Sequence, residues 1–342
     1  MTLAIGDGGN DVNMIQRAHI GVGIFGKEGN QAAFASDYAI AKFSFLWRLL
    51  FVHGRWAYLR TSNFINFFFY KNLIFTLPQF WFALYSGYSG QSIYDNTYIT
   101  NYNTVFTSVA PVYYASLEQD INPRENQTIR KAMPFVYEEF RRINLFSPKK
   151  FLFWWVTGII HSTIIFYLTL ESCADIVNAD GQTFDLWGNS VQTLTGVFFT
   201  VFGIIFIGTH HFNIITFICY IPCTLLAFFP IGNIVLDQFE TPMQYVLSDI
   251  IETPKVWPAL LLTTVACVFT VYIPRTYFVH FKPTLADLLM QDRKKRWSRK
   301  VCKAYEAESL KEGAQSPTKK FNFDASIVIA GWCESKFDQQ TL

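Results

Sequence analysis

Charged residues are scarce in this sequence of 342 residues. Asp, Glu, Lys and Arg together make up 16% of it, whereas soluble domains carry about 25%. Hydrophobic residues account for 51% and aromatic residues for 18%, including 35 Phe and 9 Trp. This composition is typical of a membrane protein with aromatic side chains at the lipid–water interfaces. The formal net charge of +2 is close to balance, and we expect no nucleic-acid partner.

The sequence also shows neither a cysteine framework nor the pattern of a signal peptide. The six cysteines are scattered, and Cys219 and Cys223 are four residues apart in an apolar run, with no matching pair elsewhere. We interpret these two as buried hydrophobic residues rather than as metal ligands or a disulfide. Residues 1–11 are rich in Gly and Asp and have no basic region leading into an apolar one, so no signal peptide is expected.

One apolar run stands out, residues 64–85, with the sequence FINFFFYKNLIFTLPQFWFALY. As a helix it would be roughly 30 Å long, the thickness of the hydrocarbon core of a bilayer. A soluble helix of this length would show a polar stripe, but here the apolar residues run nearly all round. We predict a membrane span, kinked at Pro78, with one cation inside it, Lys71.

Five further apolar runs predict a domain of six spans over residues 64–280. The additional spans are expected at about 99–117, which Pro111 would interrupt, and at about 151–170, 191–208, 212–231 and 257–277. Basic residues cluster in the stalk 43–63, in the loop between the second and third spans, and in the tail 281–342. By the positive-inside rule both termini are cytosolic, and the sequon at Asn126 would therefore remain unglycosylated.

The first 42 residues have a different pattern. Short apolar runs at 2–5, 20–24 and 38–41 alternate with helical patterns after residue 12 and at 31–36. This alternation predicts a parallel α/β sheet. About forty residues are too few to bury an independent core. We therefore expect the segment to pack on a partner or on a preceding part of a longer protein.

The turn after the first strand reads GDGGND, residues 6–11. Glycines let a backbone approach a phosphate, carboxylates are ligands that Mg²⁺ prefers, and the N-terminus of a following helix favours an anion. These features indicate a Mg²⁺ and phosphoryl site at Asp7, Asn10 and Asp11. A plain Asx turn is the alternative interpretation.

Longer strings around this turn carry a family resemblance. TLAIGDGGNDVNMIQ resembles the hinge motif of P-type ATPases, members of the haloacid-dehalogenase superfamily. EG-QA-ASD-AI, RLL-VHGR and FFYKN, in that order, resemble the type IV branch, the phospholipid flippases. The resemblance implies that 1–42 belong to a phosphorylation domain, with Asp7 as Mg²⁺ ligand and with Asn10 and Asp11 at the phosphoryl group or nucleotide, Asp11 also near the metal. It also implies ATP as substrate, an aspartyl-phosphate cycle and lipid movement toward the cytosolic leaflet.

The sequence departs from this family by what it lacks. It has no DKTGT-like or DGET-like string, no nucleotide-binding domain and no counterpart of the family's first four spans. We expect it to be a C-terminal portion that needs the N-terminal part and does not hydrolyse ATP alone. A truncated non-catalytic membrane protein is the alternative. The resemblance further implies a two-span accessory glycoprotein, for which the outer connections 87–100 and 171–188 are plausible docking surfaces, and a plasma, Golgi or endosomal membrane.

The second candidate site surrounds Lys71, because an ionisable residue inside a span is a functional hypothesis. The resemblance places this lysine near the lipid headgroup path. We expect Lys71, Asn72, Asn103 and Thr107 to line a polar groove for a headgroup. Two alternatives are open: Lys71 snorkels to the interface, and Asn103 and Thr107 join helices instead. A cation pump, the rival within the superfamily, would need carboxylates in these spans, and 64–117 contain only Asp95.

Three histidines and the tail complete the predictions. We expect His161 to form hydrogen bonds between helices, and His210 and His211 to be interfacial residues at a turn rather than a metal site. The tail is expected to be mostly disordered, although its basic cluster is suited to anionic lipid and 321–332 to docking on a cytosolic domain.

Overall fold

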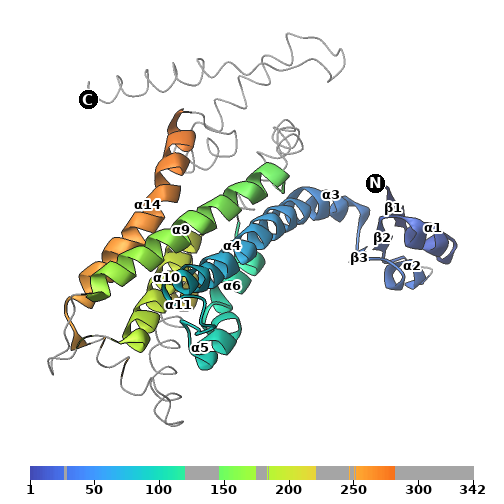
Figure 1. Cartoon of the computed structure of the whole chain (residues 1–342). Coiled ribbons are helices and arrows are strands. Elements are labelled where there is room, and N and C mark those ends of the chain that lie inside the picture. The colour runs from blue at the N-terminus through green and yellow to red at the C-terminus, as the bar shows by residue number, and fades with distance from the viewer. Residues whose placement is uncertain are drawn as a thin grey trace, which may run out of the picture. The chain divides into compact units, whose positions relative to one another are not determined.

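The structure is a computed structural model, and it describes residues 1–26, 29–119, 146–174, 183, 185–220, 246, 250 and 252–281. Its described part is mainly helical, with one small sheet (Figure 1). Several predictions lie outside these residues. They concern the sequon at Asn126, most of the connection 171–188, the second half of the span 212–231, Cys223, and the tail.

A three-stranded parallel sheet forms the N-terminal segment. Strand β2 lies in the centre, with Leu3 opposite Ile20 on one side and Val22 opposite Tyr38 on the other. The elements in chain order are β1 (Leu3–Gly6), η1 (Gly9–Asp11), α1 (Val12–Arg17), β2 (Ile20–Ile24), α2 (Gln31–Phe34) and β3 (Tyr38–Ile40). The predicted α/β order is confirmed.

Gly23 allows α2 to lie directly on β2. A Cβ at this position would lie 2.5 Å from the Cα of Ala33 and 2.6 Å from the carbonyl oxygen of Ala32. Both neighbours are backbone atoms, so they cannot move aside. The sheet and the helix therefore approach each other more closely here than any side chain would permit.

The predicted stalk, 43–63, and the first predicted span, 64–85, form one nearly continuous helical run rather than two separate elements. The run consists of η2 (Phe43–Phe45), α3 (Leu46–Arg48), the π-helical turn η3 (Leu49–Gly54) and α4 (Arg55–Tyr85). Helix α4 has 31 residues, which makes it about 46 Å long. Pro78 lies inside α4.

The second predicted span is broken into three pieces. They are α5 (Asn96–Asn101), the π-helical η4 (Tyr102–Phe106) and α6 (Val109–Leu117). The interruption falls at Thr107 and Ser108 and not at Pro111, so that prediction was wrong. Pro111 is the third residue of α6, and a proline is tolerated there because N–H groups in the first turn have no partner within the helix.

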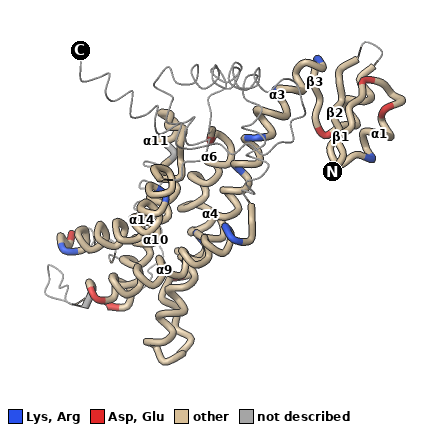
Figure 2. Tube along the Cα trace, turned by 90° about the horizontal axis from the view of Figure 1, so that it is seen from above, with Lys and Arg blue, Asp and Glu red and all other residues tan. Residues whose placement is uncertain are grey.

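Three long helices follow, α9 (Pro148–Ala174), α10 (Leu186–Gly208) and α14 (Val256–Phe281), with the short α11 (Ile214–Tyr220) between the last two. In the part of the chain that the structure describes, these three long helices are apolar enough and long enough to cross a membrane. Figure 2 shows long stretches of them without any Lys, Arg, Asp or Glu. They correspond to the third, fourth and sixth predicted spans.

The other three predicted spans have weaker support. Helix α4 is long enough, but its asparagines, glutamine and lysine lower its mean hydropathy; α5, η4 and α6 are each too short; and α11 is described only to Tyr220. The number of six spans and their orientation remain predictions.

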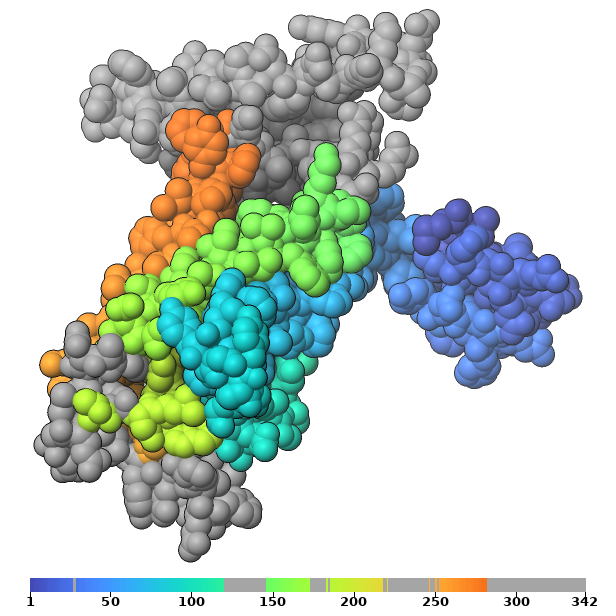
Figure 3. Space-filling model, in the orientation of Figure 1, coloured from blue at the N-terminus to red at the C-terminus, as the bar shows by residue number. Residues whose placement is uncertain are grey.

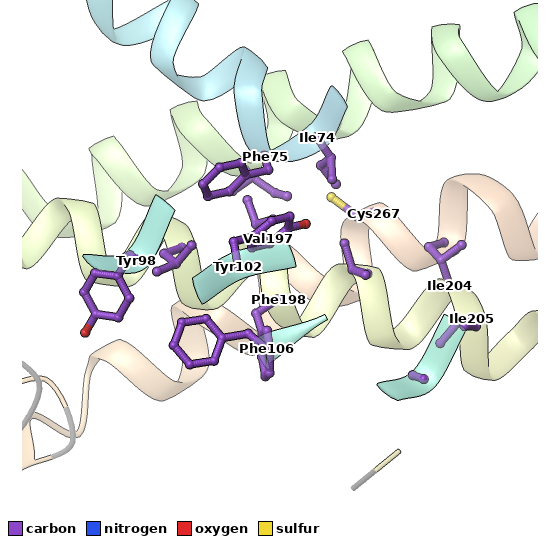
Figure 4. Packing of buried hydrophobic residues seen from close by; sticks show 14 of the residues in the cluster. Ile74, Phe75, Tyr98, Tyr102, Phe106, Val197, Phe198, Ile204, Ile205 and Cys267 are labelled. Atoms are coloured by element: carbon purple, nitrogen blue, oxygen red, sulfur yellow. The ribbon is translucent and has the colours of Figure 1, made fainter. Parts of the chain in front are cut away.

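Helix α4 packs along α9, and α9 in turn contacts α10 and α14 (Figures 1 and 3). Gly158 of α9 meets Leu73 of α4, whose Cδ2 would lie 2.8 Å from a Cβ at position 158. Buried apolar and aromatic residues from α4, η4, α10 and α14 fill the centre (Figure 4). There Phe75 stacks between Tyr102, at 4.0 Å between ring centroids, and Tyr94, at 4.8 Å.

Candidate functional site

The first candidate site is the GDGGND turn at the carboxyl end of β1. Asp7 and Asn10 are exposed, and Asp11 is half-buried. One carboxylate oxygen of Asp11, Oδ2, accepts hydrogen bonds from the backbone N–H of Asp7 at 3.2 Å and of Gly8 at 3.5 Å. A Cβ at Gly6 would lie 2.3 Å from the Cβ of Asp11. The turn is thus wound tightly around the Asp11 side chain.

This geometry gives the carboxylates of Asp7 and Asp11 different environments. The Asp7 side chain is exposed to solvent and free to meet a cation, while Asp11 uses one oxygen to hold the turn. Hard carboxylate oxygens suit Mg²⁺, which is usually held by one or two carboxylates together with phosphate and water. Within the described residues no three His, Cys, Asp or Glu side chains gather as a metal cluster. The donors present fit a Mg²⁺ ion that is bound mainly by Asp7 and phosphate.

The second candidate site lies around Lys71 in the middle of α4. Lys71 is only 3% exposed. Its ammonium donates to the hydroxyl of Thr107 at 3.0 Å and to the carbonyl of Thr107 at 3.3 Å. It also lies 5.4 Å from the centroid of the Phe68 ring and 5.9 Å from that of Tyr102. The structure therefore brings Lys71 and Thr107 together and does not show the lysine snorkelling.

The π-helical turn η4 shapes this contact. The Thr107 hydroxyl donates to the carbonyl of Tyr102 at 2.6 Å, and the Thr107 backbone N–H donates to the same carbonyl at 3.0 Å. The Tyr102 hydroxyl donates to the backbone carbonyl of Lys71 at 2.8 Å. Thr107 closes the wide turn, and Tyr102 fastens it to α4. Single π turns inside helices frequently occur at functional sites.

The two predicted asparagines lie differently. Asn72 is half-buried, and its Oδ1 is buried without a hydrogen-bond partner among the described residues. Such an atom is a vacant acceptor next to the lysine. Asn103 is exposed, because the π turn directs Tyr102 and Phe106 inward and they are buried. The structure gives no contact between Asn103 and Lys71 among the residues that it describes.

Sequence reasoning found one interhelical residue and missed its partners. His161 of α9 is fully buried and forms hydrogen bonds with Tyr70 of α4, at 2.6 Å, and Thr270 of α14, at 2.5 Å. The prediction for His161 is confirmed. Tyr70 adjoins Lys71 in the FFYKN string, which was the available signal. No sequence signal indicated Thr270, because 109 residues separate it from His161.

A second polar cluster joins the ends of α6, α10 and α14. Glu118, 1% exposed, accepts from the backbone N–H of His210 at 2.7 Å and lies 3.3 Å from His210 Nδ1. Arg275 contacts His210 Nε2 at 2.8 Å, and Arg60 of α4 donates to the backbone carbonyl of Glu118 at 2.5 Å. His210 thus lies at a turn, as expected, and links charged residues of distant segments.

Comparison with known proteins identifies the family to which this chain is similar. The model of the C-terminal region of phospholipid-translocating P-type ATPases matches residues 33–284. Human phospholipid-transporting ATPase ID is 38% identical over 295 residues, which cover 84% of this chain and 24% of that protein. Human phospholipid-transporting ATPase IC is 35% identical over 312 residues, with 88% and 25% covered. The probable phospholipid-transporting ATPase 5 of Arabidopsis thaliana is 34% identical over 332 residues, with 90% and 26% covered.

This chain spans about a quarter of the length of these relatives. The family model begins within α2 and extends through α14, and it includes Lys71 and its surroundings. The chain belongs to the phospholipid-transporting P-type ATPases, as a C-terminal portion of one.

Proposed function

We propose that this chain provides the phospholipid path of an ATP-driven flippase, which moves an aminophospholipid or a related lipid from the outer or luminal leaflet to the cytosolic one. The observation that supports the proposal most is the buried ammonium of Lys71 in mid-helix. The identity of the lipid, the direction and the remaining protein are parts of this proposal. The membrane would be a plasma, Golgi or endosomal membrane, with both termini of the chain cytosolic.

The surroundings of Lys71 favour an anionic ligand. Within the described residues its partners are all neutral: two oxygens of Thr107 and two aromatic rings. A buried cation without a counter-ion is costly. The phosphate of a lipid headgroup would supply the missing negative charge. The vacant Oδ1 of Asn72 would accept from a headgroup ammonium or hydroxyl.

Thr107 is well suited to release the lysine. Its hydroxyl proton already goes to the carbonyl of Tyr102, so Lys71 is bound only through lone pairs. Moving the ammonium from Thr107 to a phosphate would leave every donor of Thr107 satisfied. We propose Lys71, Asn72 and Thr107 as lipid-path residues. Asn103 is proposed only as an exposed residue at the rim of that path.

The α/β segment would serve phosphoryl transfer in the complete enzyme. Asp7 would hold Mg²⁺, which supplies positive charge to the transferring phosphoryl group. Asn10 would contact the nucleotide or the phosphoryl group, and Asp11 would keep the turn in shape through its bonds to Asp7 and Gly8. The phosphorylated Asp and the ATP site would come from the N-terminal part. A two-span accessory glycoprotein would dock on the outer connections, 87–100 among them.

A chimera tests this proposal. The chain would replace the matching quarter of human phospholipid-transporting ATPase ID, and ATP hydrolysis would be measured in detergent with phosphatidylserine, phosphatidylcholine or no added lipid. Lys71→Met keeps the length of the side chain and removes its charge. Lys42→Met, at an exposed lysine before α3, is the matched control.

We expect a phospholipid to stimulate hydrolysis, Lys71→Met to abolish the stimulation and Lys42→Met to preserve it. Stimulation that survives in Lys71→Met would refute the assignment of the lipid path. A chimera that is inactive although the human parent is active would favour the alternative of a non-catalytic membrane protein. Stimulation by a metal cation instead of a lipid would favour a cation pump.

A further inference from the structure

Three helices are connected by a chain of hydrogen bonds next to Lys71. The Tyr70 hydroxyl of α4 lies 2.6 Å from His161 Nδ1 on α9, and His161 Nε2 lies 2.5 Å from the Thr270 hydroxyl on α14. Tyr70 and His161 are fully buried, while Thr270 is exposed at the flank of α14. Trp154 packs edge-on against the Tyr70 ring, at 5.3 Å between centroids.

The directions of these hydrogen bonds can be assigned by starting from Thr270. The Thr270 hydroxyl donates to the carbonyl of Cys267 at 2.7 Å, so it must accept from His161 Nε2. His161 therefore carries a proton on Nε2, and in a neutral imidazole Nδ1 is then an acceptor. The Tyr70 hydroxyl supplies the proton for that acceptor. With a neutral imidazole, each donor has one acceptor.

These hydrogen bonds fix the rotation of helix α4 about its own axis. Successive residues of an α-helix are about 100° apart around the axis, so the direction of Tyr70 determines that of Lys71. Tyr70 is directed toward His161, and Lys71 is then directed toward Thr107. The Tyr102 hydroxyl also donates to the backbone carbonyl of Lys71. Figure 4 shows Ile74, one turn after Tyr70, beside Cys267 of α14.

We propose that Tyr70, His161 and Thr270 are positioning residues, which keep the ammonium of Lys71 aimed at Thr107 and at the lipid path. This proposal rests on the proposed role of Lys71. In this proposal Tyr70 acts through the orientation of α4, because its hydroxyl bonds to His161 of α9. Buried hydrogen bonds that join three helices also stabilise the bundle, so the test must separate orientation from stability.

The test measures how fast N-ethylmaleimide labels a cysteine of Lys71→Cys in the full chain, purified in detergent, with site-specific quantification by mass spectrometry. Tyr70→Phe removes only the Tyr70 hydroxyl, at one end of the row of hydrogen bonds. Thr270→Val removes the hydroxyl at its other end. Thr264→Val is the matched control, since among the described residues the Thr264 hydroxyl donates to the carbonyl of Leu260 in its own helix. A second reporter, Thr157→Cys, lies on α9 at a buried position one turn before His161.

We expect Tyr70→Phe to accelerate labelling at position 71 by about tenfold, the effect of losing one buried hydrogen bond. Thr270→Val should act in the same direction, while Thr264→Val should have no effect, and labelling at position 157 should stay unchanged. Unchanged labelling at position 71 in Tyr70→Phe would overturn the proposal. An equal acceleration at positions 71 and 157 would also overturn it, since that would show a general loss of stability.

The protonation of His161 gives a second readout. Histidine ¹⁵N resonances distinguish an imidazole protonated on Nε2 from one protonated on Nδ1, and His161→Gln assigns the signal. We expect protonation on Nε2 and a shift of the Nδ1 resonance in Tyr70→Phe; protonation on Nδ1 would contradict the chain of bonds. Neither measurement needs lipid or ATP. Failure of the proposed transport function, seen in the chimera, is therefore distinguishable from failure of this proposal.

Discussion

Replacing Glu118 with Ala should loosen the ends of α6, α10 and α14 together. The carboxylate is 1% exposed and accepts from the backbone N–H of His210 at 2.7 Å. Arg275 approaches His210 Nε2 at 2.8 Å. Because an arginine nitrogen can only donate, Nε2 accepts and Nδ1 carries the proton that faces Glu118. One carboxylate thus anchors both the turn at His210 and, through the imidazole, Arg275.

The magnitude follows from the bonds lost. A hydrogen bond to a charged acceptor contributes about 1.5–3 kcal/mol, and the bond from the His210 N–H belongs to this class. The contact with Nδ1, at 3.3 Å and with the His210 side chain 30% exposed, adds little because water replaces it. The bond from Arg60 to the backbone carbonyl of Glu118 survives. We therefore expect a loss of about 2–3 kcal/mol, which lowers Tm by about 5–10 °C.

The assay is thermal unfolding of the purified chain in detergent, followed by circular dichroism at 222 nm. Glu171→Ala is the control, since Glu171 is an exposed glutamate on α9. We expect Glu118→Ala to lower Tm and Glu171→Ala to leave it within experimental error. Equal Tm values for Glu118→Ala and the unmodified chain would refute the reasoning, because they would show that the carboxylate does not hold these helices together.

Three further predictions concern single contacts. Gly23→Ala should speed tryptic cleavage of the α/β segment, because its Cβ would meet the backbone of α2, whereas Gly8→Ala, with nothing within 4 Å of its Cβ, should not. Tyr102→Phe should lower Tm in the same unfolding assay by about 2–4 °C through the loss of about 1 kcal/mol from its bond to the Lys71 carbonyl; an unchanged Tm would show that this bond contributes nothing. Asp7→Asn in the chimera should reduce phosphoenzyme formation from ATP by about two orders of magnitude, and normal formation would remove Asp7 from the Mg²⁺ site.

The sequence predicted well what depends on neighbouring residues. The order of strands and helices in the first 42 residues follows from short apolar runs between glycine turns, and the sheet confirms it. The long helices α9, α10 and α14 follow from apolar runs of sufficient length. Lys71 was singled out because a charge inside a span is rare.

Contacts between distant segments were beyond sequence reasoning. Pro111 was expected to interrupt its helix, but the break depends on Thr107 folding back onto the Tyr102 carbonyl. The same π turn explains why Thr107 meets Lys71 while Asn103 is exposed. Glu118 and His210 are 92 residues apart, and no spacing indicates that they meet. The partners of His161 were missed for the same reason.

The most direct test of the central claim is the movement of a phospholipid by the chimera in proteoliposomes. A phospholipid labelled on an acyl chain with a fluorophore would be quenched selectively in the outer leaflet, before and after addition of ATP and Mg²⁺. Because added ATP reaches only pumps with their cytosolic side outward, we predict that the outer leaflet gains labelled lipid. Lys71→Met should abolish this gain, and Lys42→Met should not. Hydrolysis of ATP without lipid movement, or movement that persists in Lys71→Met, would contradict the account.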